Sequence, residues 1–221
     1  FQDAVLTELN GIKSIPNSFL DTGGLKIYTT LDMNAQSSLE QSIKENLKNN
    51  EEVQTSGIMI DPKTGNIIAL VGGKDYSTSQ YNRATKSLRQ VGSTMKPFLY
   101  YAALENGFTS STSFTSEQTT FAFSNKDSYS PKNANEIYGH KPISLAAAIA
   151  YSENIYAIKT HMFLGEDTLV NMAKRLGITA KLPEIPSLPL GTSEIGIIEM
   201  ASAYSVFANN GYKNRPHLIT K

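Results

Sequence analysis

The chain has 221 residues, enough for one substantial core, and its 40% hydrophobic and 18% charged residues are typical of a globular domain. Twenty basic and twenty acidic residues leave a formal net charge of zero, which argues against a dominant basic surface for nucleic acid. The absence of cysteine excludes disulfides and thiolate sites, and the three histidines (His140, His161 and His217) are too scattered to predict a metal, so we expect no metal and no cofactor.

The N-terminal part predicts two helices separated by a strand. Residues 4–9 ("AVLTEL") indicate a short helix, and residues 25–32 ("LKIYTTLD") alternate in the manner of a strand. Apolar residues then recur every four positions over 35–47, which predicts an amphipathic helix capped by Asp32 or Asn34.

A hairpin and a single helix follow. Two apolar runs in residues 56–73 flank "DPKTG", whose proline and glycine favour a turn, so this segment should form a β-hairpin. Residues 74–92 are polar and irregular, and "STMKPFLYYAALENG" (93–107) predicts a helix that stops at its glycine. Residues 108–143 show no period and predict a long excursion over the surface, of the kind that is often functional.

The rest of the chain is predominantly helical by pattern. The expected helical segments are 144–152, 153–165, 166–177 and 194–211, with a proline-rich loop at 178–193 and a possible strand at 212–220. Strands that precede a block of helices predict an α+β fold, in which an antiparallel sheet is flanked by helices.

Ser93 and Lys96 form the first pair of chemical interest. Residues three apart share one face of a helix, so the two side chains should meet if the helix begins near Ser93. Gly92 allows a sharp entry into the helix, and Pro97 is tolerated only in the first turn. A buried lysine can become the neutral amine that activates a serine nucleophile, and free N–H groups at a helix start favour an anionic intermediate.

Ser152 and Asn154 form the second pair, between two helical segments. A turn there could direct Ser152 toward Lys96 as a proton relay, with Asn154 binding a substrate amide or holding Lys96. Serine and asparagine are also ordinary cap and turn residues, and an isolated S-x-x-K match is common by chance. A protein whose Ser93 is merely a surface serine therefore stays open at this point.

S-x-x-K followed by S-x-N resembles the signature of penicillin-binding proteins and serine β-lactamases. Nearly the whole chain resembles the transpeptidase domain of class A penicillin-binding proteins. The matching stretches, in the order of the family, are "GLKIYTTLD", "IDPKTGNIIALVGG", "GSTMKPFLYYAALENG", "SLAAAIAYSENI" and "LGTSEIGIIEMASAYSVFANNGYKNRPHLI". The resemblance implies the fold of that family, with residues 1–24 as a linker region and 25–221 as the N-terminal and central part of the domain.

The resemblance also implies a reaction. Ser93 would attack D-Ala-D-Ala stem peptides to form an acyl-enzyme, and a neighbouring strand's amine would then cross-link peptidoglycan. Lys96 would be the base, Ser152 the relay to the leaving amine and Asn154 a substrate contact, with the Ser93 N–H as half of the oxyanion hole. β-Lactam antibiotics would acylate Ser93. The parent protein would lie on the extracytoplasmic face of the bacterial membrane, with an N-terminal anchor and a glycosyltransferase domain.

The third motif of the family, K-T-G, departs from this pattern. It occurs only as Lys63-Thr64-Gly65, which precedes Ser93 and sits in the predicted hairpin turn, so we interpret it as a coincidental match. We expect the remaining C-terminal part of the domain to carry the true motif and the present chain to be inactive without it. No apolar run approaches the ~20 residues that span a bilayer, and no signal peptide is recognisable.

Two alternatives on the same fold remain. A class A serine β-lactamase needs a glutamate in a pattern like E-x-x-L-N; "EDTLVN" begins with Glu166, but Val170 interrupts the pattern. A non-catalytic β-lactam sensor would keep Ser93 without peptide exchange.

Overall fold

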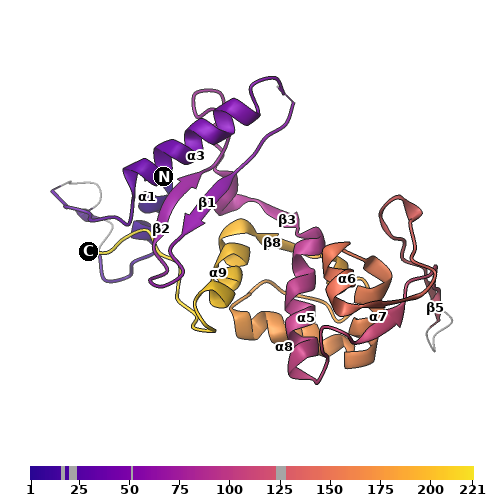
Figure 1. The fold of residues 1–221 in the computed structure, drawn as a ribbon. Coiled ribbons are helices and arrows are strands. Elements are labelled where there is room, and N and C mark those ends of the chain that lie inside the picture. Colours follow the sequence, from indigo (N-terminus) through magenta and orange to yellow (C-terminus); the bar gives the residue numbers. More distant parts are fainter. Residues whose placement is uncertain (16–17, 20–23, 51, 123–127) are drawn as a thin grey trace. The chain divides into compact units, whose positions relative to one another are not determined.

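A computed structural model describes residues 1–15, 18–19, 24–50, 52–122 and 128–221 (Figure 1). These residues divide into two compact units. Unit 1 comprises Phe1–Leu88 and Gly196–Lys221, and unit 2 comprises Arg89–Ile195. Helices and antiparallel strands occur together, which confirms the α+β class.

Unit 1 is built around the predicted β-hairpin. Its elements are α1 (Gln2–Asn10), α3 (Met33–Asn46), β1 (Gly57–Ile60), β2 (Ile67–Val71), α4 (Arg83–Lys86) and α9 (Ile197–Ala208). β1 and β2 pair antiparallel, with Gly57 opposite Val71, while α3 packs on β2 and α9 on β1 (Figure 1). Of the two expected caps of α3, Asp32 is the one used, since its side chain accepts the N–H groups of Asn34 and Ala35.

The core of unit 1 draws on both ends of the chain. Its buried apolar side chains are Ala4, Val5, Ile67, Leu70, Ala84 and Leu218. The segment 25–32, expected to be a strand, is extended but forms only an isolated bridge, between Thr29 and Ile219. Its neighbour is the segment 218–221, and the Thr30 N–H donates to the Leu218 carbonyl at 3.0 Å.

Unit 2 is mainly helical. Its regular elements are η1 (Gly92–Met95), α5 (Lys96–Glu105), β4 (Ser113–Thr115), β5 (Phe121–Ala122), β6 (Ser128–Tyr129), η2 (Ala134–Glu136), β7 (Pro142–Ser144), α6 (Leu145–Ala150), α7 (Asn154–Leu164), α8 (Glu166–Leu176) and η3 (Leu188–Leu190). β3 (Leu88–Gln90) and β8 (Glu194–Gly196) pair where the chain enters and leaves this unit. Helices α7 and α8 pack on α5 and bury side chains such as Phe98, Tyr156 and Leu169.

The long segment 108–143 is tied to the rest of unit 2 at both ends. β4 and β7 pair antiparallel, with Ser113 opposite Ser144, so the excursion leaves and returns at the same place. Among the described residues the strands form two-stranded pairs, because each run is only two to five residues long.

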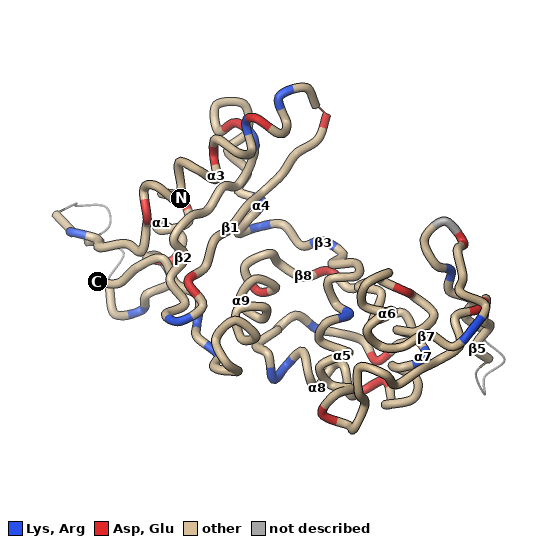
Figure 2. Tube along the Cα trace, in the orientation of Figure 1, with Lys and Arg blue, Asp and Glu red and all other residues tan. Residues whose placement is uncertain are grey.

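Basic and acidic residues are interspersed along the described trace (Figure 2). None of the helices in the described ranges is both long and apolar enough to cross a bilayer.

Candidate active site

Ser93 lies in a tight turn that opens α5. The predicted helix does not begin at Ser93 as an α-helix: a 3₁₀ turn, η1, holds residues 92–95, and the α-helix begins at Lys96 with Pro97 in its first turn. Gly92 has φ +59°, and its N–H donates to the Gly191 carbonyl at 3.1 Å. The Ser93 side chain is exposed and therefore accessible to a ligand.

The Lys96 amine lies beneath this turn and is almost completely buried, with 3% of the residue exposed. Its Nζ donates to the Ser152 carbonyl at 2.6 Å, to Asn154 Oδ1 at 2.6 Å and to Ser152 Oγ at 3.1 Å. Burial lowers the pKa of Lys96 from 10.5 to about 8, and the nearby charge of Glu153 opposes part of that shift. The amine therefore loses its proton at a lower pH than an ordinary lysine does, although the protonated form still predominates near physiological pH.

The structure brings Lys96, Ser152 and Asn154 into direct contact, from segments more than fifty residues apart. The Lys96 backbone N–H donates to the Ser93 carbonyl, but within the described part of the chain no side-chain hydrogen bond joins Ser93 Oγ to Lys96 Nζ, whose acceptors are Ser152 and Asn154. All three N–H groups of an ammonium have acceptors here, which is the geometry of the protonated form.

Ser152 occupies an unusual backbone conformation between α6 and α7. Its φ is +50°, in the left-handed region that a side chain rarely adopts. The turn is held by the Ser152 N–H on the Ile149 carbonyl (3.2 Å) and the Glu153 N–H on the Ala148 carbonyl (3.0 Å). Such conformations cluster at functional sites, because the surrounding structure must over-determine them.

The site contains polar residues that the sequence did not indicate. Glu153, 6% exposed, caps α7 by accepting the Tyr156 N–H, and it also accepts from Ser116 Oγ (2.6 Å) and Asn133 Nδ2 (2.7 Å). A carboxylate at the start of an apolar helix is favoured by the helix dipole, and this is the signal that could have indicated Glu153. Ser116 and Asn133 lie in the aperiodic segment 108–143 and carry no such signal.

The two motifs set aside in the sequence lie in ordinary structural settings. Lys63-Thr64-Gly65 forms the β1–β2 turn, where Thr64 Oγ1 donates to Asp61 at 2.8 Å and Gly65 has φ +81°. Glu166 lies in the first turn of α8, and Val170 is a buried core residue of that helix, 3% exposed.

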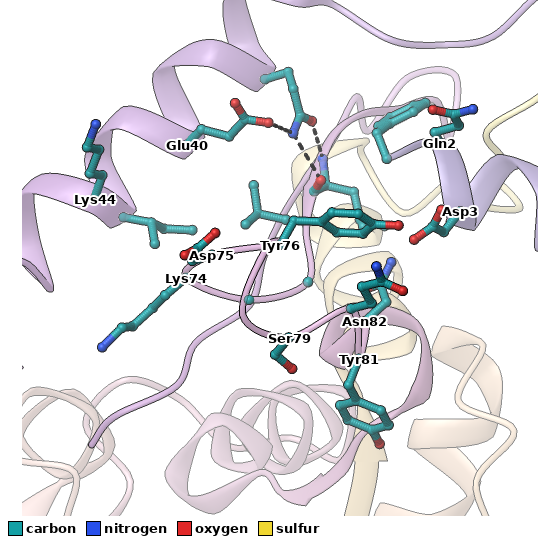
Figure 3. A pocket seen from close by; sticks show the side chains of 18 residues that line it. Gln2, Asp3, Glu40, Lys44, Lys74, Asp75, Tyr76, Ser79, Tyr81 and Asn82 are labelled. Atoms are coloured by element: carbon teal, nitrogen blue, oxygen red, sulfur yellow. Dashed lines mark hydrogen bonds between the residues drawn. The ribbon is translucent and has the colours of Figure 1, made fainter. Parts of the chain in front are cut away.

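A separate cavity of about 490 Å³ lies in unit 1, lined by residues of α1, α3 and the segment 70–82 (Figure 3). Gln36 in its wall is already bonded to Glu40 and to the Leu70 backbone. None of the four predicted site residues lines it. The described residues include no group of three or more acidic or histidine side chains able to hold a metal ion.

Comparison with known proteins gives a consistent result. The sequence profile described as "Penicillin binding protein transpeptidase domain" matches residues 55–221. Penicillin-binding protein 2D of Bacillus subtilis is 45% identical over the whole chain, and penicillin-binding protein 1A of Pseudomonas aeruginosa is 40% identical over 76% of it. The chain spans only 32% and 21% of those two proteins.

Solved structures agree with the sequence relatives. Penicillin-binding protein 1A from Haemophilus influenzae is 35% identical over 76% of the chain, with a TM-score of 0.72 and 25% of that protein covered. PonA1 from Mycobacterium tuberculosis, solved in complex with penicillin V, covers the whole chain with a TM-score of 0.83; 61% of that chain is matched, and its 24% identity shows the fold alone. The fold is therefore that of a penicillin-binding protein transpeptidase domain. The chain belongs to the penicillin-binding protein transpeptidase family, which confirms the resemblance read from its motifs.

Proposed function

We propose that this chain supplies the nucleophile, base and proton relay of a serine D,D-transpeptidase that cross-links peptidoglycan. The family relationship supports a cell-wall transpeptidase. The observation that carries the finer proposal is the Lys96 amine: it is buried, its pKa is lowered to about 8, and it contacts Ser152 and Asn154.

Acylation begins at Ser93. Its Oγ attacks the carbonyl carbon of the penultimate D-alanine while its proton passes to the neutral Lys96 amine. The tetrahedral intermediate collapses, the C–N bond to the terminal D-alanine breaks, and Ser152 Oγ relays a proton to the leaving amine. Asn154 serves as a substrate contact and as an acceptor that holds Lys96.

The second half of the reaction releases the acyl group. The amine of a neighbouring stem peptide attacks the Ser93 ester, forms the new amide and returns the proton to the serine oxygen. β-Lactams enter the same route, because their ring amide imitates the stem peptide, and they acylate Ser93. The third family motif, K-T-G, is proposed to supply the second oxyanion N–H from sequence C-terminal to Lys221.

The setting of the reaction is also a proposal. By analogy with its relatives, the parent protein is anchored on the extracytoplasmic face of the bacterial membrane and carries a glycosyltransferase domain. Its partners there are the peptidoglycan stem peptides.

Covalent labelling of the full-length protein tests the assignment of Ser93. We expect a fluorescent penicillin to label the wild type on the peptide that contains Ser93, and Ser93→Ala to abolish labelling. Ser38→Ala, which changes an exposed serine on α3, is the matched control and should label normally. Labelling that persists in Ser93→Ala would contradict the proposal.

Product analysis then separates the rival functions. A transpeptidase forms cross-linked stem peptides and holds its penicilloyl ester for many minutes. Rapid turnover of penicillin would indicate a β-lactamase, and a stable ester without any peptide exchange would indicate a sensor.

A further inference from the structure

The Ser152–Asn154 turn contacts a partly buried polar cluster, of which Ser116, Lys132 and Asn133 come from the segment 108–143. The members of this cluster are Ser116, Lys132 (through its carbonyl), Asn133, Glu153 and Asn154. Ser116 closes the cluster on its far side, since its Oγ donates to Glu153 at 2.6 Å and accepts the Gly139 N–H at 2.9 Å.

Asn133 stands at the centre of this cluster, with 9% of its surface exposed. Its Oδ1 accepts the backbone N–H groups of Asn154 (2.8 Å) and Ile155 (3.3 Å), the first two residues of α7. Its Nδ2 donates to Glu153 Oε1 (2.7 Å) and to the Ile137 carbonyl (2.9 Å). A side-chain amide has two donors and two acceptor sites, so the hydrogen-bonding capacity of Asn133 is fully used.

The partners of Asn133 also fix which way its amide faces. The Ile137 carbonyl can only accept, and the backbone N–H groups of Asn154 and Ile155 can only donate. In a flipped amide, Nδ2 would face the two backbone N–H groups and Oδ1 would face the Ile137 carbonyl. Only the observed orientation therefore satisfies all of these partners.

The neighbouring carbonyl determines how Asn154 faces Lys96. Asn154 Nδ2 donates to the Lys132 carbonyl at 2.7 Å, and that carbonyl can only accept. The other end of the amide, Oδ1, must therefore face the Lys96 amine, which it meets at 2.6 Å. The dipeptide Lys132-Asn133 thus sets both the backbone of the S-x-N turn and the atom that Asn154 presents to the base.

We infer that Asn133 is a positioning residue of the acyl-transfer reaction, which holds Ser152 and Asn154 in register with Lys96 through the start of α7 and through Glu153. This inference rests on the proposed function. It also assigns a role to the segment 108–143. Its residues Ser116 and Asn133 hold Glu153 and the start of α7 in place and are not themselves reacting groups.

Loss of Asn133 should act on the chemical step. Removing its side chain leaves the Asn154 and Ile155 N–H groups and one Glu153 lone pair without their partner, and the left-handed turn at Ser152 loses its outer support. A displacement of about 1 Å at a reacting group reduces a rate on the order of 100-fold. We therefore expect Asn133→Ala to lower the first-order acylation constant roughly 10- to 100-fold, with the dissociation constant of the initial complex changed by less than about threefold.

The experiment is stopped-flow acylation of the full-length protein by a fluorescent penicillin, which separates the two constants. Asn82→Ala is the matched control: Asn82 is also 9% exposed and caps a helix, α4, but lies in unit 1. Both variants lose a buried asparagine, and we expect only Asn133→Ala to slow acylation. Equal acylation constants in the wild type and Asn133→Ala would overturn the inference.

A paired substitution keeps the test decisive if Asn133→Ala does not fold. Asn133→Asp retains the acceptor for the α7 N–H groups but places a second carboxylate against Glu153, so acylation should fall. Adding Glu153→Gln returns one donor to that contact, and the double variant should regain at least tenfold over N133D. Absence of any recovery would overturn the pairing of Asn133 with Glu153 as the means of positioning.

Failure of the proposed function gives a different result. In that case the wild type itself is not acylated on Ser93, whatever residue stands at position 133. If the wild type is acylated and neither Asn133 variant differs from it, the inference alone is wrong.

Discussion

The acceptors around Lys96 differ in what they can do when the amine loses a proton. The Ser152 carbonyl and Asn154 Oδ1, both at 2.6 Å, can only accept, so they retain the two N–H groups of a neutral amine. Ser152 Oγ, at 3.1 Å, is a hydroxyl that can reverse and donate. The lone pair of the neutral amine is then directed toward Ser152 Oγ, the hydroxyl that we propose as the relay.

The pH dependence of acylation should follow the neutral fraction of Lys96. Since burial lowers its pKa to about 8 and the neutral form is the base, the acylation rate should rise with pH and level off above about 8. The measurement is the acylation constant of a fluorescent penicillin from pH 6 to 9.5. A rate that falls as pH rises through this interval would mean that protonated Lys96 is the active form.

Glu153→Gln should move this profile to lower pH. The Glu153 carboxylate stabilises the ammonium and raises the pKa of Lys96, whereas burial lowers it. Removing the Glu153 charge should therefore lower the pKa of Lys96 further. Glu117→Gln removes an exposed carboxylate of the same unit and is the matched control. An acidic limb that stays at the wild-type position in E153Q would show that the carboxylate does not act on the base.

Lys96→Arg should keep the positive charge but lose the base. A guanidinium stays protonated in proteins, so it can donate to the same acceptors and cannot take the Ser93 proton. Loss of general-base catalysis predicts an acylation rate about 100- to 10,000-fold lower. Acylation of K96R within tenfold of the wild type would exclude Lys96 as the base, provided that circular dichroism shows the fold unchanged.

Two short motifs, read together with the family resemblance, predicted contact among Lys96, Ser152 and Asn154. Each is identified by a short motif at a helix start, and the structure joins all three. Asn133 and Ser116 could not be found in this way, because neither belongs to a recognisable motif; their partners lie 20 to 37 residues distant in sequence. Their segment has no periodicity, so only tertiary structure reveals what they contact.

At the scale of elements, the turn that carries Ser93 is supported by η3. The two short 3₁₀ segments pack on one another, and the glycines at their ends meet closely. Gly191 has φ +68°, and a Cβ on it would lie 2.0 Å from the Gly92 carbonyl oxygen. Both its conformation and its surroundings therefore require glycine.

Gly191→Ala should displace the Ser93 turn. The clash is with backbone, which cannot move away as a flexible side chain could, so we expect a lower melting temperature and an acylation rate reduced at least tenfold. Gly107→Ala is the control: its φ is +89° with nothing within 4 Å of the added Cβ, so it carries backbone strain of roughly 1–2 kcal/mol without a clash. Comparable acylation by the two variants would show that strain alone explains the effect.

The elements themselves were predictable where the pattern is local. The β1–β2 hairpin, the Asp32-capped helix α3 and the glycine-terminated α8 all follow from nearby turn and cap residues. Residues 25–32 are extended, as their alternation indicates, but in the described structure they form only the isolated Thr29–Ile219 bridge and not the predicted strand. The packing of η3 on η1 joins residues about 100 positions apart, and the prolines of 178–193 indicated only a loop.

At the scale of the whole molecule, the chain builds unit 1 from its two ends and unit 2 from its middle. The last residues bind the first part of unit 1 through Leu218, which is buried at 4% exposure and whose N–H donates to the Glu8 carboxylate at 2.8 Å. Helix α1, in the region expected to precede the domain, adds Ala4 and Val5 to the same core. Each unit therefore has apolar contacts of its own, so the free energy of opening can be measured for each unit separately.

Leu218→Ala should loosen unit 1 alone. Truncating a buried leucine costs about 2–5 kcal/mol, and the amides that lose protection from hydrogen exchange should lie in Phe1–Leu88 and Gly196–Lys221. Leu169→Ala, at a fully buried position of α8, is the reciprocal variant and should loosen Arg89–Ile195 instead. Hydrogen exchange with mass spectrometry on both variants decides the matter. If either substitution lowers protection equally throughout the chain, the two units open as one cooperative structure, and the acylating residues of unit 2 depend on the core built by the chain ends.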